Sequence, residues 1–169
     1  MYLIDTNVIS EARKRTRADP GVTAFFTRAA AADEPLYLSA VTVGELRRGV
    51  ELIRYRGDGA QADVLEAWLA MVLAEFGGNV LAFDADAAQV WGRLRVPHPE
   101  HELDKQIAAI ALIYDLTVVT RNTAGFAGTG VKLMNPFHTA GRPGALNHPG
   151  FAGGRLSGNG ACDEIAHHG

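Results

Sequence analysis

The chain has a single cysteine, Cys162, and no apolar run long enough to cross a bilayer. One cysteine cannot form an intrachain disulfide or a cysteine-based zinc site. A membrane span needs about 18 consecutive apolar residues, so we expect no membrane segment. Residues 1–5 have no basic flank and do not match a signal peptide. These absences favour a protein of the reducing cytoplasm.

The sequence also lacks an excess of positive charge, since its net charge is −3. This balance argues against a general nucleic-acid binder, because affinity for phosphate backbones usually comes from surplus Lys and Arg. The basic residues are nevertheless clustered, at Arg13, Lys14, Arg15 and Arg17 and again at Arg47, Arg48, Arg54 and Arg56. Each cluster fits either a local phosphate-binding surface or a solvated helix face.

Short apolar runs bounded by polar or turn residues predict buried parallel strands. They lie at residues 2–4, 36–39, 80–83 and 117–120, with a weaker run at 131–134. Helical patterns separate them, at 41–56, 64–76, 85–95 and 102–115. Alternation of strands and helices indicates an α/β fold with a mostly parallel sheet.

One helical pattern is clearer than the others. It predicts a single apolar stripe on a helix that ends at Gly77 and Gly78, formed by Val64, Leu65, Trp68, Leu69, Val72, Leu73 and Phe76. Core packing is the ordinary use of such a stripe, and contact with a partner is the alternative.

Residues 138–169 differ in character from the rest, being rich in glycine and histidine and without periodic apolar positions. We therefore expect one folded domain at 1–137, followed by a flexible tail at 138–169. The histidines of the tail are too scattered to predict a metal site.

Three acidic residues lie at informative places. Asp5 directly follows the first strand, and ligands of open α/β sheets bind beyond the carboxyl ends of strands. Glu45 follows the second strand and is preceded by Gly44, which predicts the close approach of another group. Asp104 lies near the start of an apolar helix.

Each acid has a structural alternative. Asp5 and Asp104 could cap helices, and Glu45 could be a first-turn acid favoured by the helix dipole. Together they are three carboxylates expected at one edge of one sheet, where they would repel one another unless a cation lay between them. Hard divalent cations prefer oxygen ligands, so the set predicts a Mg²⁺ or Mn²⁺ site acting on a phosphate ester.

At these residues the chain resembles the PIN-domain family, specifically toxins of the VapC and FitB type. The matching segments occur in order across residues 1–137: Ile4-Asp5-Thr6-Asn7-Val8-Ile9-Ser10, Ser39-Ala40-Val41-Thr42-Val43-Gly44-Glu45-Leu46, Asp104-Lys105-Gln106-Ile107-Ala108-Ala109, Thr117-Val118-Val119-Thr120-Arg121-Asn122 and Asn135-Pro136-Phe137. Any one segment is weak, whereas the ordered set is specific.

The resemblance implies a three-layer α/β/α sandwich and a Mg²⁺- or Mn²⁺-dependent endoribonuclease. It also implies a homodimer, neutralised by a cognate VapB-like antitoxin in a heterotetramer or larger assembly. The metal ligands of the family carry over to Asp5, Glu45 and Asp104. As catalytic residues we expect the same three acids with Asn122, and as substrate-binding residues Thr6, Asn7, Arg13 and Arg121.

The chain departs from the family at its fourth acid. The family usually has an acid just before a phenylalanine after the Thr-Arg-Asn run, and Gly125 stands there before Phe126. Asn122 can still offer a neutral oxygen, but an amide holds a cation less strongly. One metal ion is therefore expected rather than two.

Two other functions remain open. The lost acid fits a degenerate PIN domain that only binds an antitoxin. A phosphatase of the haloacid dehalogenase type also begins with an Asp after its first strand. In that class a second Asp stands two residues later, where this chain has Asn7.

Overall fold

The computed structural model describes residues 1–137, and the predicted tail at 138–169 lies outside the described residues. Its sheet has five parallel strands in the order β3-β2-β1-β4-β5. The strands are β1 (Tyr2–Ile4), β2 (Leu36–Ser39), β3 (Val80–Leu81), β4 (Thr117–Val119) and β5 (Lys132–Met134). The parallel sheet predicted from the apolar runs is confirmed.

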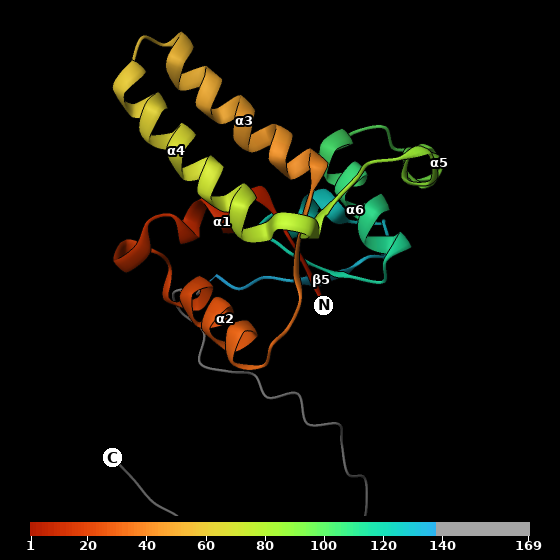
Figure 1. Cartoon of the computed structure of the whole chain (residues 1–169). Helices are drawn as coiled ribbons and strands as arrows, with labels where there is room; N and C mark the ends of the chain where they lie inside the picture. The colour runs from red at the N-terminus through yellow and green to blue at the C-terminus, as the bar shows by residue number, and fades with distance from the viewer. Residues whose placement is uncertain (138–169) are drawn as a thin grey trace, which may run out of the picture. The chain divides into compact units, whose positions relative to one another are not determined.

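Six α-helices connect these strands in the described part of the chain (Figure 1). They are α1 (Thr6–Ala12), α2 (Pro20–Ala31), α3 (Ala40–Tyr55), α4 (Gly59–Phe76), α5 (Ala85–Leu94) and α6 (Glu102–Ile113). Most begin after an Asp or Ser whose side chain accepts a backbone N–H of the first turn, as Ser39 does from Thr42. Helix α4 ends at Gly77, whose φ of 46° is costly for other residues.

The helices cover both faces of the sheet. Successive residues of a strand point to opposite faces, so each strand can contribute side chains to both helix layers. Ile4, Leu38 and Val119 pack in one buried cluster with residues of α1, α2, α3 and α4. Leu3 and Val118 pack on the other side with α5 and α6. The three-layer α/β/α sandwich implied by the family resemblance is confirmed.

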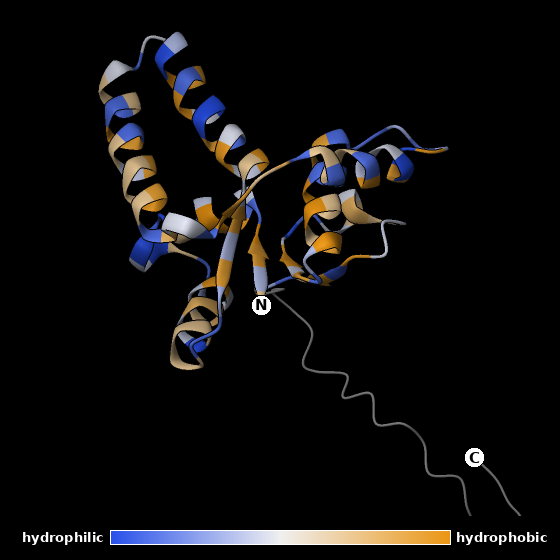
Figure 2. Ribbon diagram, turned by 45° about the vertical axis from the view of Figure 1, so that its right-hand side comes forward, coloured by the Kyte–Doolittle hydropathy of each residue, from blue (hydrophilic) through white to orange (hydrophobic). Residues whose placement is uncertain are grey.

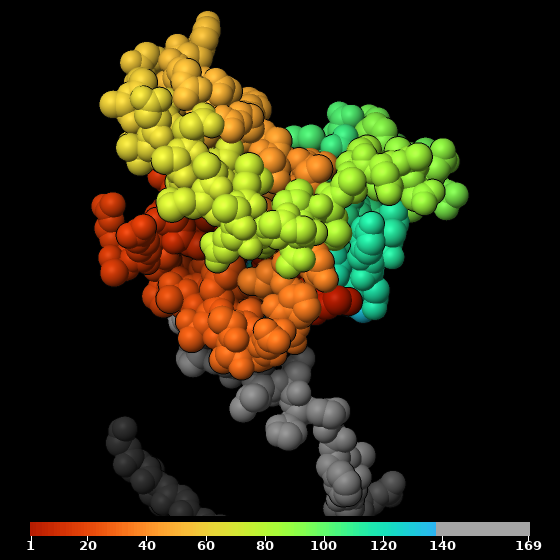
Figure 3. Space-filling view, viewed as in Figure 1, coloured from red at the N-terminus to blue at the C-terminus, as the bar shows by residue number. Residues whose placement is uncertain are grey.

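Helices α3 and α4 lie side by side, and the far end of this hairpin projects beyond the residues of the sheet (Figures 1 and 3). The half of α4 nearer the sheet is mostly apolar, and its first turns are more polar (Figure 2). The predicted apolar stripe is wrong at Val64, which is 61% exposed. The stripe begins instead at Ala62, which is fully buried. Val64 is two residues further along the chain, and residues two apart do not share a helix face, so Val64 is turned away from the stripe.

The third strand is also shorter than predicted, since it ends at Leu81 and not at Phe83. Its partner β2 pairs through Ser39↔Leu81 and then becomes helix α3 at Ala40. Ala82 and Phe83 therefore have no strand beside them to pair with.

The strand order reverses direction between β1 and β4, which are neighbours although far apart in sequence. In open parallel sheets, ligands bind at such a switch point, outside the carboxyl ends of the strands. Asp5 follows β1 and Thr120 follows β4, so both lie at this edge. None of the described helices is long and apolar enough to span a membrane.

The packing of α4 predicts a clear difference between two truncations on one helix. Leu69 is fully buried, so we expect Leu69→Ala to lower the free energy of unfolding by about 2–5 kcal/mol. Val64→Ala is the matched control and should change it by no more than about 0.5 kcal/mol. Urea denaturation of the two variants measures both values, and equal losses would contradict the described register of α4.

Candidate active site at the carboxyl edge of the sheet

Asp5 is almost fully buried at the end of β1, with 4% of its surface exposed. Its Oδ1 accepts the backbone N–H of Thr6 at 2.7 Å, which caps α1. Its Oδ2 accepts the hydroxyl of Thr120 at 2.6 Å and the amide of Asn7 at 2.5 Å. Burial raises the pKa of Asp5, and these hydrogen bonds partly oppose the rise. Asp5 therefore caps α1 and is also one of the three acids of the candidate site.

Glu45 is the sixth residue of α3, so it is not the first-turn acid considered above. Its Oε2 accepts the hydroxyl of Thr6 at 2.5 Å. Burial raises the pKa of Glu45, and repulsion from Asp5 and Asp104 raises it further. The bond from Thr6 and the charge of Arg48 act in the opposite direction.

Asp104 is the third residue of α6 and does not cap it, since His101 precedes the helix without a side-chain cap bond. Its Oδ2 accepts the amide of Asn122 at 3.1 Å and lies 3.7 Å from Nδ1 of His101. Burial raises the pKa of Asp104, and the charge of Asp5 adds to the rise. His101 and Asn122 oppose it.

The charges of the three carboxylates therefore act on one another, with Asp5 just after β1, Glu45 in α3 and Asp104 in α6. They do not form a closed ligand set, because no three acidic, His or Cys side chains of residues 1–137 converge as ligands of one metal ion. Mg²⁺ characteristically keeps several waters and takes only one or two carboxylates directly. An open set of repelling oxygens suits a hydrated cation of this kind.

Thr120 is a site residue that the sequence prediction missed. Its hydroxyl donates to Asp5 and accepts both the backbone N–H of Asn122, at 2.9 Å, and the amide of Asn7, at 3.0 Å. The predicted strand 117–120 included Thr120, whereas β4 ends at Val119, so Thr120 follows its strand as Asp5 follows β1. His101 was missed too, and no sequence pattern indicates its approach to Asp104.

The four predicted substrate residues have different surroundings. Thr6 donates to Glu45, and the amide oxygen of Asn7 accepts the backbone N–H of Arg121 at 3.0 Å. The guanidinium of Arg121 lies 4.8 Å from the ring centre of Phe137, and that of Arg13 lies 5.6 Å from the ring of Trp68. Both distances allow cation–π attraction. Thr6 and Asn7 thus help to position the acids, while Arg13 and Arg121 rest on aromatic rings.

The expectation of a close approach at Gly44 is wrong for the described residues. A Cβ built there would have no protein atom within 4 Å. Gly44 lies on an exposed part of α3, where the next residue, Glu45, turns toward the acids.

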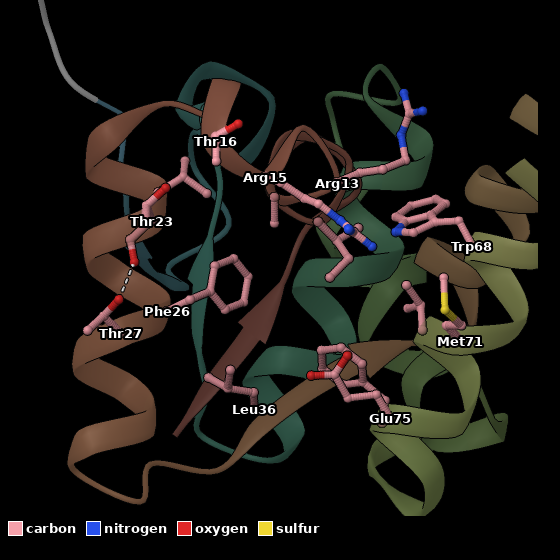
Figure 4. A pocket seen from close by; sticks show the side chains of 15 residues that line it. Arg13, Arg15, Thr16, Thr23, Phe26, Thr27, Leu36, Trp68, Met71 and Glu75 are labelled. Atoms are coloured by element: carbon pink, nitrogen blue, oxygen red, sulfur yellow. Dashed lines mark hydrogen bonds between the residues drawn. The ribbon is translucent and has the colours of Figure 1, made fainter. Parts of the chain in front are cut away.

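A groove of about 730 Å³ lies beside the carboxylates and not at them. It runs between α2 on one side and α1 and α4 on the other, with Phe26 facing Trp68 and Met71 across it (Figure 4). A smaller cavity of about 210 Å³ is lined by Thr6 and Glu45. Arg13 and Trp68 line both, so they separate the groove from the acidic site.

Comparison with known proteins gives relatives over nearly their whole length. Toxin FitB of Neisseria gonorrhoeae is 38% identical over 144 residues, which cover 82% of this chain and 99% of that protein. VapC ribonuclease Y4jK of Sinorhizobium fredii is 35% identical, with 83% of this chain and 100% of that protein covered. The solved FitAcB structure from Neisseria gonorrhoeae matches with a TM-score of 0.70 at 37% identity, covering 82% of this chain and all of the matched chain.

A family model described as "PIN domain" matches residues 2–131, which include the whole acidic edge of the sheet and four of its five strands. With this match and relatives of such identity, the chain belongs to the PIN-domain family.

Proposed function

We propose that this chain is the toxin of a toxin–antitoxin pair and hydrolyses RNA phosphodiester bonds with the help of Mg²⁺ or Mn²⁺. One observation carries the proposal: Thr6 hydrogen-bonds both Asp5 and Glu45, and Thr120 and Asn122 link Asp5 to Asp104, at the switch point of the sheet. The relatives named FitB toxin and VapC ribonuclease support it. The nuclease domain would then be residues 1–137.

Asp5, Glu45 and Asp104 would hold the cation, directly or through waters, since hard cations prefer oxygen ligands. A divalent cation held there would supply polarisation of the phosphate and a water of lowered pKa. Asp5, fixed by three hydrogen-bond donors, would provide the rigid ligand.

Glu45 or Asp104 would accept the proton of the attacking water, because a raised pKa brings a carboxylate closer to the operating pH. Thr6 would orient Glu45, and Asn122 would orient Asp104. Arg13 and Arg121 would bind the phosphate backbone of the RNA, and Asn7 would fix the backbone that carries Arg121.

The groove between α2 and α4 would bind the antitoxin. Its floor is apolar, with Phe26 and Met71 along it, and it leads to Arg13 and Trp68 beside Glu45. A bound segment with apolar side chains would bury these residues and close the path to the acids. The solved FitAcB and FitAB structures of relatives support a protein partner for this chain.

Removal of one carboxylate charge tests the catalytic assignment. We expect Asp104→Asn and Glu45→Gln each to lower the rate of RNA cleavage by about 10²-fold or more, with the fold retained. Asp63→Asn is the matched control, since Asp63 has 80% of its side chain exposed on α4, and should cut at the wild-type rate. The assay uses purified chain free of antitoxin, with Mn²⁺ titration by calorimetry in parallel. A wild-type chain that binds no metal and cuts no RNA would favour the degenerate, binding-only domain.

The raised pKa values predict two opposite trends with pH. As pH falls toward 4.5, the ordinary pKa of Glu, the folded metal-free protein takes up protons before the unfolded chain does, so these acids destabilise it less. Over the same range the affinity for Mn²⁺ should fall, because the ligands lose their charge. Glu66, whose pKa is lowered by its hydrogen bond with Arg47, has the opposite effect on stability.

The measurement is therefore the difference between wild type and Glu45→Gln. At neutral pH the variant should melt at a higher temperature than the wild type without metal, and the difference should shrink as pH falls. Melting curves without metal give this difference across pH. A wild-type protein that is the more stable of the two at neutral pH would contradict the described repulsion.

A substitution in the groove tests antitoxin binding without changing the residues proposed to be catalytic. Met71 is 57% exposed and lines the groove, so Met71→Asp should weaken antitoxin binding by about tenfold or more. Val64→Asp is the control, since Val64 is equally exposed on α4 but does not line the groove. The affinity of each variant for the antitoxin encoded beside the gene, and its RNA cleavage without antitoxin, are measured together. Equal affinity in both variants would exclude this groove.

A further inference from the structure

Gly125 lies in a short 3₁₀ turn, Thr123–Phe126, directly after the strand β4 and Asn122. A Cβ at this position would lie 2.0 Å from Oδ2 of Asp104 and 2.6 Å from the side-chain nitrogen of Asn122. Its φ is not in the left-handed region, so backbone conformation does not demand a glycine here. Glycine fits here because a Cβ would have no room beside Asp104 and Asn122. The same test at Gly92 finds no atom within 4 Å.

The space beside Gly125 is filled by the hydrogen bond from Asn122 to Asp104. Asn122 is held from its other side, because its backbone N–H donates to Thr120, whose hydroxyl donates to Asp5. A continuous series of bonds therefore runs from Asp104 through Asn122 and Thr120 to Asp5. It fixes the two acids relative to each other, and it depends on the missing side chain at 125.

We propose that Gly125 is a positioning residue, whose missing side chain allows Asn122 to orient the carboxylate of Asp104 toward one divalent cation. The proposal rests on the proposed function of the acidic site. It gives the glycine at the position of the fourth acid a role of its own. A Cβ at 125 would occupy the place that Oδ2 of Asp104 now holds, so Asp104 would have to turn away from Asn122.

Displacing the side chain of Asp104 should change the affinity for a cation more than it changes the free energy of unfolding. The atoms that a new Cβ would meet belong to the ends of two side chains, of which Asp104 is partly exposed. Such ends can rotate away at small cost, and the core below them stays packed. Partners that orient a metal ligand are worth about 10- to 100-fold in metal affinity.

The experiment compares Gly125→Ala, Gly125→Asp and the control Gly92→Ala, which lies on exposed α5. Mn²⁺ binding is measured by calorimetry on the full chain without antitoxin, and melting curves report the fold. We expect one Mn²⁺ per wild-type chain, and an affinity about 10- to 100-fold lower in both Gly125 variants. Gly92→Ala should bind as the wild type does, and all the melting temperatures should lie close together.

A second readout needs no metal. The side-chain amide protons of Asn122 in the NMR spectrum of the metal-free protein should shift in Gly125→Ala and not in Gly92→Ala. Wild-type affinity in Gly125→Ala, an unshifted Asn122 signal, or a second Mn²⁺ gained by Gly125→Asp would each overturn the proposal. A wild-type chain that binds no Mn²⁺ would instead refute the proposed function, and the Asn122 signal would still decide whether Gly125 positions Asp104.

Discussion

The burial of Asp5 at the end of β1 is the constraint on which the rest of the site depends. A buried carboxylate needs donors, and here they are Thr6, Asn7 and Thr120. Thr120 reaches Asp5 because β1 pairs with β4 in the register Ile4↔Val119. A slip of one residue would turn Thr120 to the other face of the sheet and leave Asp5 without that donor. The acidic site therefore requires this strand pairing and also helps to specify it.

The site works against the stability of the metal-free fold. Each of the three acids has a raised pKa, so the folded chain resists their ionised form. Thr6 and Asn122 reduce this cost at Glu45 and Asp104 without removing it. Stability lost at a functional edge is recovered in the two apolar clusters that sandwich the sheet.

The sequence predicted most of the fold because its strands are short apolar runs and its helices carry periodic stripes. It also predicted that Asp5, Glu45 and Asp104 would share an edge. The end of β1 places Asp5 there, whereas Glu45 and Asp104 lie inside helices α3 and α6, and the element before α6 is helix α5 and not a strand. It predicted no helix at Pro20–Ala31, where α2 lies. It also failed where pairing or side-chain orientation decides. Phe83 continues an apolar run but has no neighbouring strand, and Val64 lies off a stripe that begins at an alanine. The contact of Gly125 with Asp104 depends on a rotamer, which no spacing encodes.

Arg13 and Trp68 lie between the apolar groove and the acidic site. They line both the apolar groove and the small cavity that contains Glu45, although Arg13 follows α1 and Trp68 lies in α4. A partner that binds in the groove therefore meets the same two side chains that border the acids. On the proposed function, such a partner would reach Arg13 and Trp68 without touching the carboxylates themselves.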